Sequence, residues 1–220
     1  MINNMIKSDY FDKGTDFSAS DFTRPNYQLW VSKHFDKNKD DEQGLAAWVG
    51  QLVHKASYDH PEIGVIKEFS PVRYFNGVHI GGSIDRIVYN GYGMWQIEDL
   101  KTQGNYPAKK AFKEPDEKWI KQLSIYKWLA YDYDIECIGE GVIHQYVMGY
   151  QKDKKLPEYE VYNKLEIPLM SVENTELMIE SKIDIAQSSI PPDVDCPVSW
   201  MCEAYCSYSD GCPSYIKEVK

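Results

Sequence analysis

A turn signal between two short, strand-like segments constrains this chain more than any other feature. Asn90-Gly91-Tyr92-Gly93 is flanked by β-branched and aromatic residues, a pattern that predicts a tight antiparallel hairpin. A three-residue loop over 91–93 ends with a residue in the left-handed region, which Gly93 adopts readily because it lacks a Cβ. The sequence therefore predicts two neighbouring antiparallel strands in one defined register.

That register brings two carboxylates together. If Asn90 pairs with Met94, Asp85 on the first strand lies opposite Asp99 on the second, on the same face and about 5 Å away. Two like charges at this spacing destabilise a sheet, and a bound divalent cation would compensate them. The alternative is that both aspartates are solvated strand ends.

Strand alternation adds a third group to this face. Lys101 points to the side of Asp99, whereas Glu98 points to the other side and is therefore not expected to be a ligand. An ammonium beside two carboxylates can orient an attacking water or neutralise charge on a phosphate, as phosphodiester hydrolysis requires. The alternative is an ordinary surface salt bridge between Lys101 and Asp99.

A helix predicted from about Glu42 to Tyr58 supplies a histidine. His54 lies opposite the apolar stripe of this helix, on a face of small residues that would let it approach a metal site closely. A capped or solvated histidine is the alternative. The apolar stripe consists of Leu45, Val49, Leu52 and Ala56.

A second helix is predicted from Glu114 to about Asp132, with Pro115 and acidic residues in its first turn. Gln122 lies one turn before Tyr126, at the edge of the buried stripe. A half-buried glutamine either satisfies a nearby backbone group or holds a nucleotide or the active-site scaffold. The stripe consists of Trp119, Leu123, Tyr126 and Ala130.

Four motifs in this order resemble the RecB-like branch of the PD-(D/E)XK nucleases. The resemblance covers residues 44–130 directly, and a cysteine-rich tail extends it over most of the chain. It implies an α/β, restriction-endonuclease-like core, in which a central mixed β-sheet is flanked by helices. The motifs are Gly50-x-x-x-His54, Gly82-x-x-Asp85-Arg86, Asp99-x-Lys101 and Gln122-x-x-x-Tyr126.

The same resemblance implies roles for these residues. The carbonyl of Leu100 would join three side chains in binding Mg²⁺ or Mn²⁺. Lys101 would be the catalytic lysine, and Gln122 and Tyr126 would support the site and contact DNA. The three metal-binding side chains would be His54, Asp85 and Asp99.

Four cysteines near the C-terminus, separated by five, three and five residues, suggest a shared metal. RecB-like nucleases often hold an iron–sulfur cluster with a similar group, drawing one ligand from a cysteine before the histidine motif. This chain has no cysteine before Cys137, so Cys196 would take that role; zinc, free thiols and disulfides are the alternatives. Cys137 itself is expected to be a buried core residue. The four are Cys196, Cys202, Cys206 and Cys212.

Length and composition predict one domain with appendages. The 220 residues are 43% hydrophobic, enough for one core. We expect an irregular segment over 1–40, the nuclease core over 41–190 and a cysteine-rich tail over 191–220 that packs on the same domain. The absence of a long apolar run or signal-peptide pattern, with clustered cysteines, predicts a cytoplasmic protein without membrane association.

Charge distribution narrows where DNA would bind. A net charge of −10 argues against general affinity for nucleic acid. From Lys101 to Lys127, however, seven lysines minus three acidic residues give a local charge of +4. Such a basic ledge beside the carboxylates would steer DNA to one place. The alternative is a solvated helix face.

The combined expectation is a hydrolase: a metal-dependent DNA nuclease, most simply an exonuclease in recombination, repair or phage DNA metabolism. DNA would be its substrate, and recombination, helicase or CRISPR proteins its partners. One alternative is a non-catalytic DNA-binding or complex-forming module with a nuclease fold, which the intact Asp85, Asp99 and Lys101 count against. Another is a CRISPR adaptation nuclease acting with integration partners.

Overall fold

The computed structural model describes residues 14–35, 50, 52–53, 55, 61–196, 206, 208 and 212–214. His54 and Cys202, two of the predicted ligands, lie outside these residues, as does most of the helix expected between Glu42 and Tyr58. Gly50, which begins the histidine motif, is helical.

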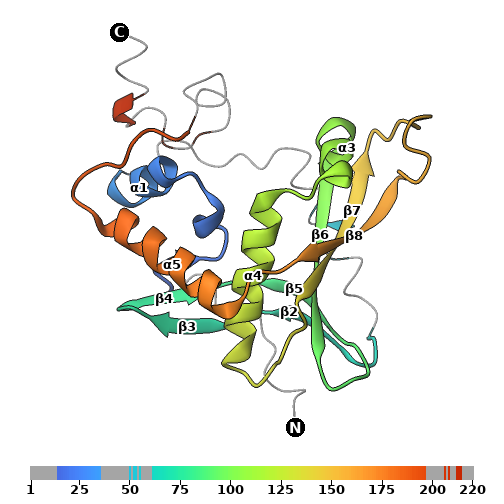
Figure 1. The fold of residues 1–220 in the computed structure, drawn as a ribbon, viewed down its shortest axis with the longest axis horizontal. Helices are drawn as coiled ribbons and strands as arrows, with labels where there is room; N and C mark the ends of the chain where they lie inside the picture. Colours follow the sequence, from blue (N-terminus) through green and yellow to red (C-terminus); the bar gives the residue numbers. More distant parts are fainter. Residues whose placement is uncertain are drawn as a thin grey trace.

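A five-stranded mixed sheet forms the centre of the molecule (Figure 1). Its strand order is β2-β5-β6-β7-β8, with β6 and β7 parallel and the other neighbours antiparallel. This arrangement confirms the expected α/β fold. The strands are β2 (Val65–Phe69), β5 (Ile84–Tyr89), β6 (Trp95–Gly104), β7 (Glu140–Met148) and β8 (Tyr162–Pro168).

A smaller sheet lies beside the first strands of the central one. Its order is β1-β4-β3, in which β1 and β4 are parallel and β3 and β4 form a hairpin. The link from β4 to β5 therefore carries the chain from the small sheet into the strand that bears Asp85. The strands are β1 (Phe17–Ser18), β3 (Val72–Phe75) and β4 (Val78–Gly81).

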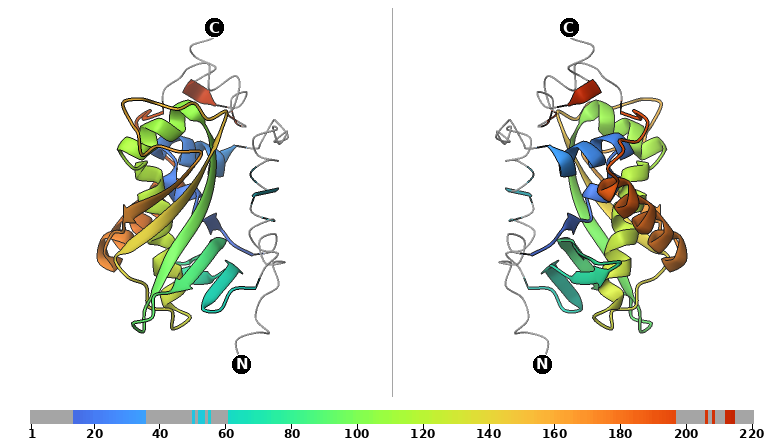
Figure 2. Two further views of the ribbon diagram at one scale, coloured as in Figure 1. Left: turned by 90° about the vertical axis from the view of Figure 1, so that its right-hand side faces the viewer. Right: turned by 90° about the vertical axis from the view of Figure 1, so that its left-hand side faces the viewer.

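Helices cover one face of the central sheet, where α3 and α4 contact β6 and α5 packs on α4 and α1 (Figures 1 and 2). None of the described helices is long and apolar enough for a membrane span. The helices are η1 (Asp21–Thr23), α1 (Asn26–His34), α3 (Asn105–Lys113), α4 (Glu117–Tyr131) and α5 (Val172–Gln187).

Two expectations about the helices were wrong. The segment over 1–40 was expected to be irregular, but α1 forms there and buries Tyr27, Leu29, Trp30 and Val31. The helix expected from Glu114 begins only at Glu117, because the Asp116 side chain accepts the Lys118 N–H and caps it. Residues 114–116 link this helix to α3, which ends at Lys113 and was not predicted from the sequence.

Alternation along β8 shows why the sheet has one covered face. Asn163, Leu165 and Ile167 are buried, and the residues between them are exposed. The buried side chains join the main core, in which Leu123, Trp128 and Leu129 of α4 are almost fully enclosed. Burial of this apolar face is the main stabilising contribution to the position of α4 on the sheet.

The hairpin between β5 and β6 has the predicted register. Arg86 pairs with Glu98 and Tyr89 with Trp95. The Asn90 N–H donates to the Met94 carbonyl at 3.0 Å. Gly93 has a φ of +84°, as the loop type requires.

Candidate active site

The strands β5 and β6 stop pairing just before the two predicted aspartates. Their Cα pairing ends at Arg86 and Glu98, one position short of Asp85 and Asp99. In place of a further backbone bond, Asp85 Oδ2 accepts the Leu100 N–H at 2.8 Å. The expected direct pairing of the aspartates is therefore replaced by a side-chain bridge across separating strands.

This separation leaves an oxygen-rich site. Asp85 is 8% exposed and Asp99 2% exposed, so both carboxylates are taken largely out of water. In an extended strand, the N–H and C=O of one residue point to the same edge, so the Leu100 carbonyl points toward the side of Asp85. Two carboxylates and a carbonyl form a hard donor set of the kind that Mg²⁺ and Mn²⁺ prefer.

Lys101 lies on the same face, as alternation predicts. Its Nζ is 2.7 Å from Asp99 Oδ2 and donates to Gln122 Oε1 at 3.1 Å. Gln122 in turn donates through Nε2 to Tyr126 Oη at 2.8 Å. A chain of polar contacts thus runs from a strand carboxylate through the ammonium to helix α4, and it restrains the lysine at both ends.

A glycine between β4 and β5 allows α4 to approach this site. A Cβ on Gly82 would lie 2.8 Å from Tyr126 Cε1 and 3.1 Å from Leu129 Cδ1. Both neighbours are buried, so neither can move away freely. The absence of a side chain at Gly82, in the predicted Gly82-x-x-Asp85 motif, therefore allows the Tyr126 ring to pack directly against the backbone.

Glu98 occupies the other face, as expected, and has two nitrogen-bearing partners there. Its Oε2 is 3.0 Å from Arg86 Nε and 2.9 Å from His144 Nε2. Burial acts to raise the pKa of Glu98, yet His144 and Arg86 hold it below its ordinary value. Arg86 and Lys67 also lower the pKa of Glu62 to about 2. This network joins β2, β5, β6 and β7 and has a structural role.

The helical segment that carries Gly50 lies next to β6. A Cβ on Gly50 would be 4.0 Å from Thr102 Oγ1, so this segment lies close to β6 at Thr102. Leu52, expected in the apolar stripe, is 45% exposed. Among the residues that the structure describes, no three histidine, cysteine or acidic side chains form a metal-binding group; His54 lies outside them.

Three of the four tail cysteines are described. Cys196 and Cys212 pack with Tyr208 against the aromatic cluster of Tyr27 and Trp30 on α1, and Cys206 is partly exposed. Cys196, Cys212 and Tyr208 are among the described contacts between the tail and α1. The iron–sulfur or zinc site stays a prediction. Cys137 is buried, as expected, and its burial raises the pKa of the thiol to about 12.

Gln103, the next residue of β6 on the face of Asp99 and Lys101, was not predicted from the sequence. Its Oε1 accepts from Gln145 Nε2 at 3.1 Å, and Gln145 is fully buried. Gln145 and Asn163 are polar residues at inward-facing strand positions. That departure from apolar alternation was the signal that could have identified them.

One solved structure has a similar fold, and two others give lower scores. The structure of SSO0001 has a TM-score of 0.59 and 19% identity, with 90% of this chain and 85% of that chain covered. An alkaline exonuclease from Laribacter hongkongensis gives 0.49 and 15%, with 77% and 87% covered. A phage-related exonuclease from Haemophilus somnus gives 0.42 and 14%, with 76% and 78% covered.

Sequence comparisons give one family and no individual relative. A comparison with curated proteins yields no match. The model of the PD-(D/E)XK nuclease superfamily matches residues 29–213, which includes both strands, α4 and most of the tail. This chain therefore belongs to the PD-(D/E)XK nuclease superfamily.

Proposed function

We propose that the protein is a metal-dependent deoxyribonuclease that acts as an exonuclease. One observation carries the proposal: Lys101 is held between a buried carboxylate, Asp99, and the amide oxygen of Gln122. A surface salt bridge with only a structural role would contribute little to stability and would not need a second partner for the ammonium on helix α4. The exonuclease form of the proposal is supported by the RecB-like order of the motifs.

Asp85, Asp99 and the Leu100 carbonyl would hold Mg²⁺ or Mn²⁺, with His54 as a further ligand. A bound divalent ion would lower the pKa of a coordinated water and stabilise negative charge on the phosphate. Lys101 would orient the attacking water and offset the developing charge on the phosphate oxygens. Asp99 has two tasks in this scheme, since it binds the metal and anchors the ammonium.

Gln122 and Tyr126 are positioning residues in this proposal. Gln122 fixes the Lys101 ammonium through Oε1, and Tyr126 orients the Gln122 amide by accepting from Nε2. A lysine side chain has several rotatable bonds, so two fixed partners lower the entropy that it must lose when the substrate binds.

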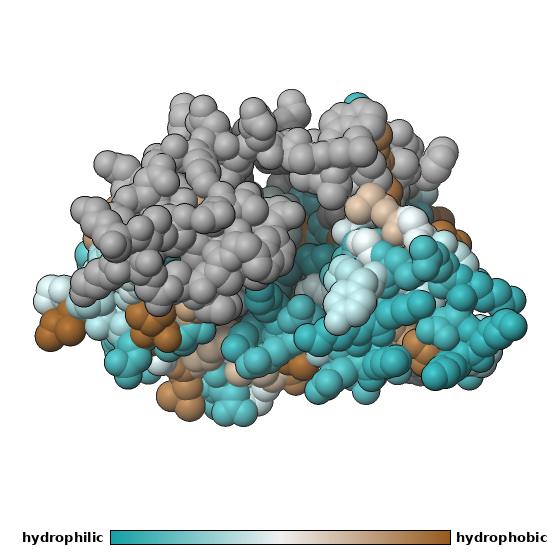
Figure 3. All heavy atoms as spheres, turned by 90° about the horizontal axis from the view of Figure 1, so that it is seen from above, coloured by the Kyte–Doolittle hydropathy of each residue, from teal (hydrophilic) through white to brown (hydrophobic). Residues whose placement is uncertain are grey.

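The DNA backbone would follow the basic ledge between Lys101 and Lys127. Lys110, Lys113 and Lys118 are exposed. Seen from above, the described surface on the side of α3 and the β7–β8 connection is mainly hydrophilic (Figure 3). Exposed lysines attract phosphates without reading sequence, which suits a nuclease that removes nucleotides processively or at many sites.

The test uses end-labelled linear DNA and closed circular DNA, single- and double-stranded, with Mg²⁺, Mn²⁺ or EDTA. We expect metal-dependent loss of linear substrates only, abolished in Lys101→Ala. Lys154→Ala removes an exposed lysine outside the site and is the matched control. Full activity in Lys101→Ala would overturn the proposal. DNA binding without cleavage by the wild type would favour the non-catalytic module.

A further inference from the structure

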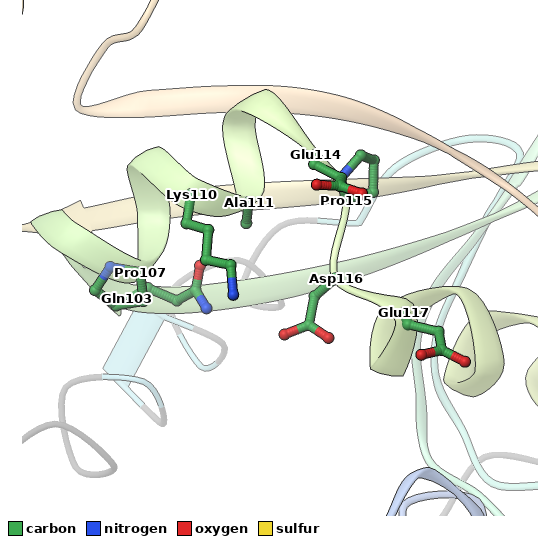
Figure 4. Close-up of a pocket in the computed structure, with 8 residues that line it drawn as sticks. All are labelled: Gln103, Pro107, Lys110, Ala111, Glu114, Pro115, Asp116 and Glu117. Carbon is green, nitrogen blue, oxygen red and sulfur yellow. The ribbon is translucent and has the colours of Figure 1, made fainter.

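A cavity of about 450 Å³ lies at the end of β6 beyond the candidate active site (Figure 4). Gln103 lines it and lies two residues after Lys101 on the same strand face, roughly 7 Å farther along. The volume is in the range of small-molecule binding sites. The other lining residues are Pro107, Lys110, Ala111, Glu114, Pro115, Asp116 and Glu117.

The amide of Gln103 has one defined orientation. Its Oε1 accepts from Gln145, whose Nε2 also donates to the Ala108 carbonyl at 3.2 Å. Gln145 Oε1 accepts from Asn163 Nδ2, and Asn163 Oδ1 accepts the Glu160 N–H at 2.9 Å. Because a backbone carbonyl can only accept and a backbone N–H can only donate, the orientation of all three amides follows.

This orientation leaves one donor for a ligand. Gln103 Nε2 has no hydrogen-bond partner within the described part of the chain, and Gln103 lines the cavity. The buried Gln145 and Asn163 hold the amide at a fixed position, so it meets a ligand without losing rotamer freedom. A donor fixed in this way recognises a carbonyl oxygen or a ring nitrogen.

The charges around the cavity disfavour a phosphate inside it. The lining carries three carboxylates, Glu114, Asp116 and Glu117, and one cation, Lys110. Lys121 Nζ is 2.7 Å from Glu117 Oε1 and offsets that charge, which leaves an excess of one negative charge at the cavity. An anion would be repelled, whereas carboxylates can accept from amino groups. Pro107 and Pro115 supply apolar walls, and Tyr106, which precedes Pro107, is 83% exposed and available to stack. The lining therefore suits an uncharged, flat, polar-edged group.

We propose that this cavity binds an unpaired nucleobase of the strand being cut, with Gln103 Nε2 as the donor to the base edge. The inference rests on the proposed nuclease function and deepens it. A base enters a cavity only when it has left the helical stack. The protein therefore prefers single-stranded DNA or frayed ends to intact duplex.

The first test removes the base and the donor separately. Abasic residues are placed one at a time at each nucleotide flanking the cut in a single-stranded oligonucleotide. At one position the wild type loses about tenfold in kcat/KM, as expected for the loss of one stacked base. Gln103→Glu keeps an acceptor for Gln145 but replaces the donor that faces the cavity with an acceptor. Its kcat/KM therefore falls about tenfold with intact DNA, and the abasic substitution causes no further loss. Gln96→Glu makes the same charge change on β6 outside the cavity and is the control.

The second test measures binding without cleavage. The wild type is mixed in EDTA with an oligonucleotide carrying 2-aminopurine at the sensitive position, or at each terminal position in turn if no cleavage is seen. We expect a saturable rise in fluorescence as the base unstacks and enters the cavity. Pro107→Trp places a large side chain at an exposed lining position and abolishes that rise. Leu177→Trp, at an exposed position of α5 outside the cavity, does not.

The two tests separate this inference from the proposed function. If the wild type shows the fluorescence rise but cleaves nothing, the cavity assignment stands and the nuclease proposal fails. If the abasic residue lowers kcat/KM by the same factor in the wild type, in Gln103→Glu and in Pro107→Trp, the cavity assignment is overturned. The absence of any fluorescence rise in the wild type would overturn it as well.

Discussion

The ring of Tyr126 lies directly over Gly82, so that a Cβ on this glycine would be 2.8 Å from Cε1 of the ring. The same tyrosine accepts the hydrogen bond from Gln122, which in turn binds the Lys101 ammonium. A backbone position between β4 and β5 is therefore coupled to the position of the proposed catalytic lysine through two side chains of α4.

Gly82→Ala is expected to lower both the rate of DNA cleavage and the stability of the fold. The added methyl displaces the Tyr126 ring, and overpacking of this kind costs about 1–3 kcal/mol in the free energy of unfolding. Displacement also disturbs the Gln122–Lys101 contact, so kcat falls about tenfold or more. Single-turnover kinetics and urea unfolding measure the two effects. Gly139→Ala, where an added Cβ meets nothing within 4 Å, is the control; equal behaviour of the two variants would contradict the coupling.

The chain of contacts behind Lys101 predicts a graded series of cleavage rates. Tyr126→Phe removes the acceptor of the Gln122 amide and costs a few-fold in rate, in line with one neutral hydrogen bond of about 1 kcal/mol. Gln122→Leu removes the direct partner of the ammonium and costs more, about 10–100-fold. Lys101→Ala removes the proposed catalytic group and is expected to cost most. Measured kcat values that break this order would show that Gln122 does not position Lys101.

Acid should weaken the fold through the Glu62 and Glu98 network. Both carboxyl groups have pKa values below those of the unfolded chain, and that of Glu62 is about 2. Their stabilising contribution is therefore complete above the ordinary pKa of 4.5 and is lost as pH falls toward 2, because the unfolded chain binds protons first. Urea unfolding at pH 7, 4 and 3 should show this loss. Glu98→Gln should be less stable at pH 7 and should reduce the dependence between pH 4.5 and 3; an unchanged pH dependence would exclude the network as its source.

Alkylation should distinguish Cys137 from the tail cysteines. Burial raises the pKa of the Cys137 thiol to about 12, so almost no thiolate exists at pH 8 and native protein should leave it unlabelled by iodoacetamide. Cys206 and Cys212 are partly exposed and should react within minutes if they hold no metal. Mass spectrometry after digestion gives the sites. If the tail cysteines resist alkylation until a chelator or an oxidant is added, the result would instead support the predicted metal or cluster.

Local chemistry explains which parts of the site the sequence could predict. The hairpin register follows from Asn90, Gly91 and Gly93, and strand alternation then assigns Asp99 and Lys101 to one face. The separation of β5 from β6 before Asp85 was not predictable, because it depends on where β6 turns to pair with β7.

Helix α3 was missed because its signals are contradictory. Gly104 and Pro107 resemble a loop, and only the position of Pro107 in the first turn makes the proline compatible with a helix. The cavity beside α3 was missed for the same reason. Its donor, Gln103, depends on amides from two strands that follow far along the chain, and long-range contacts of this kind leave little trace in local sequence patterns.

The proposed metal site predicts different effects of one substitution on stability with and without metal. Asp85→Asn keeps an oxygen that can accept the Leu100 N–H, so the fold should survive. In EDTA the variant should still unfold cooperatively and near the wild-type midpoint, because the side chain keeps its size and its acceptor for the Leu100 N–H. With Mn²⁺ at about 100 times its Kd, the wild type should gain about 2.7 kcal/mol, and the variant much less. Thermal unfolding with and without Mn²⁺, supported by calorimetric titration, measures the difference. Glu62→Gln removes a carboxylate that pairs with Arg86 in the Glu98 network, away from Asp85 and Asp99, and should retain the full stabilisation by Mn²⁺. An equal gain in stability for Asp85→Asn would show that Asp85 is not a ligand.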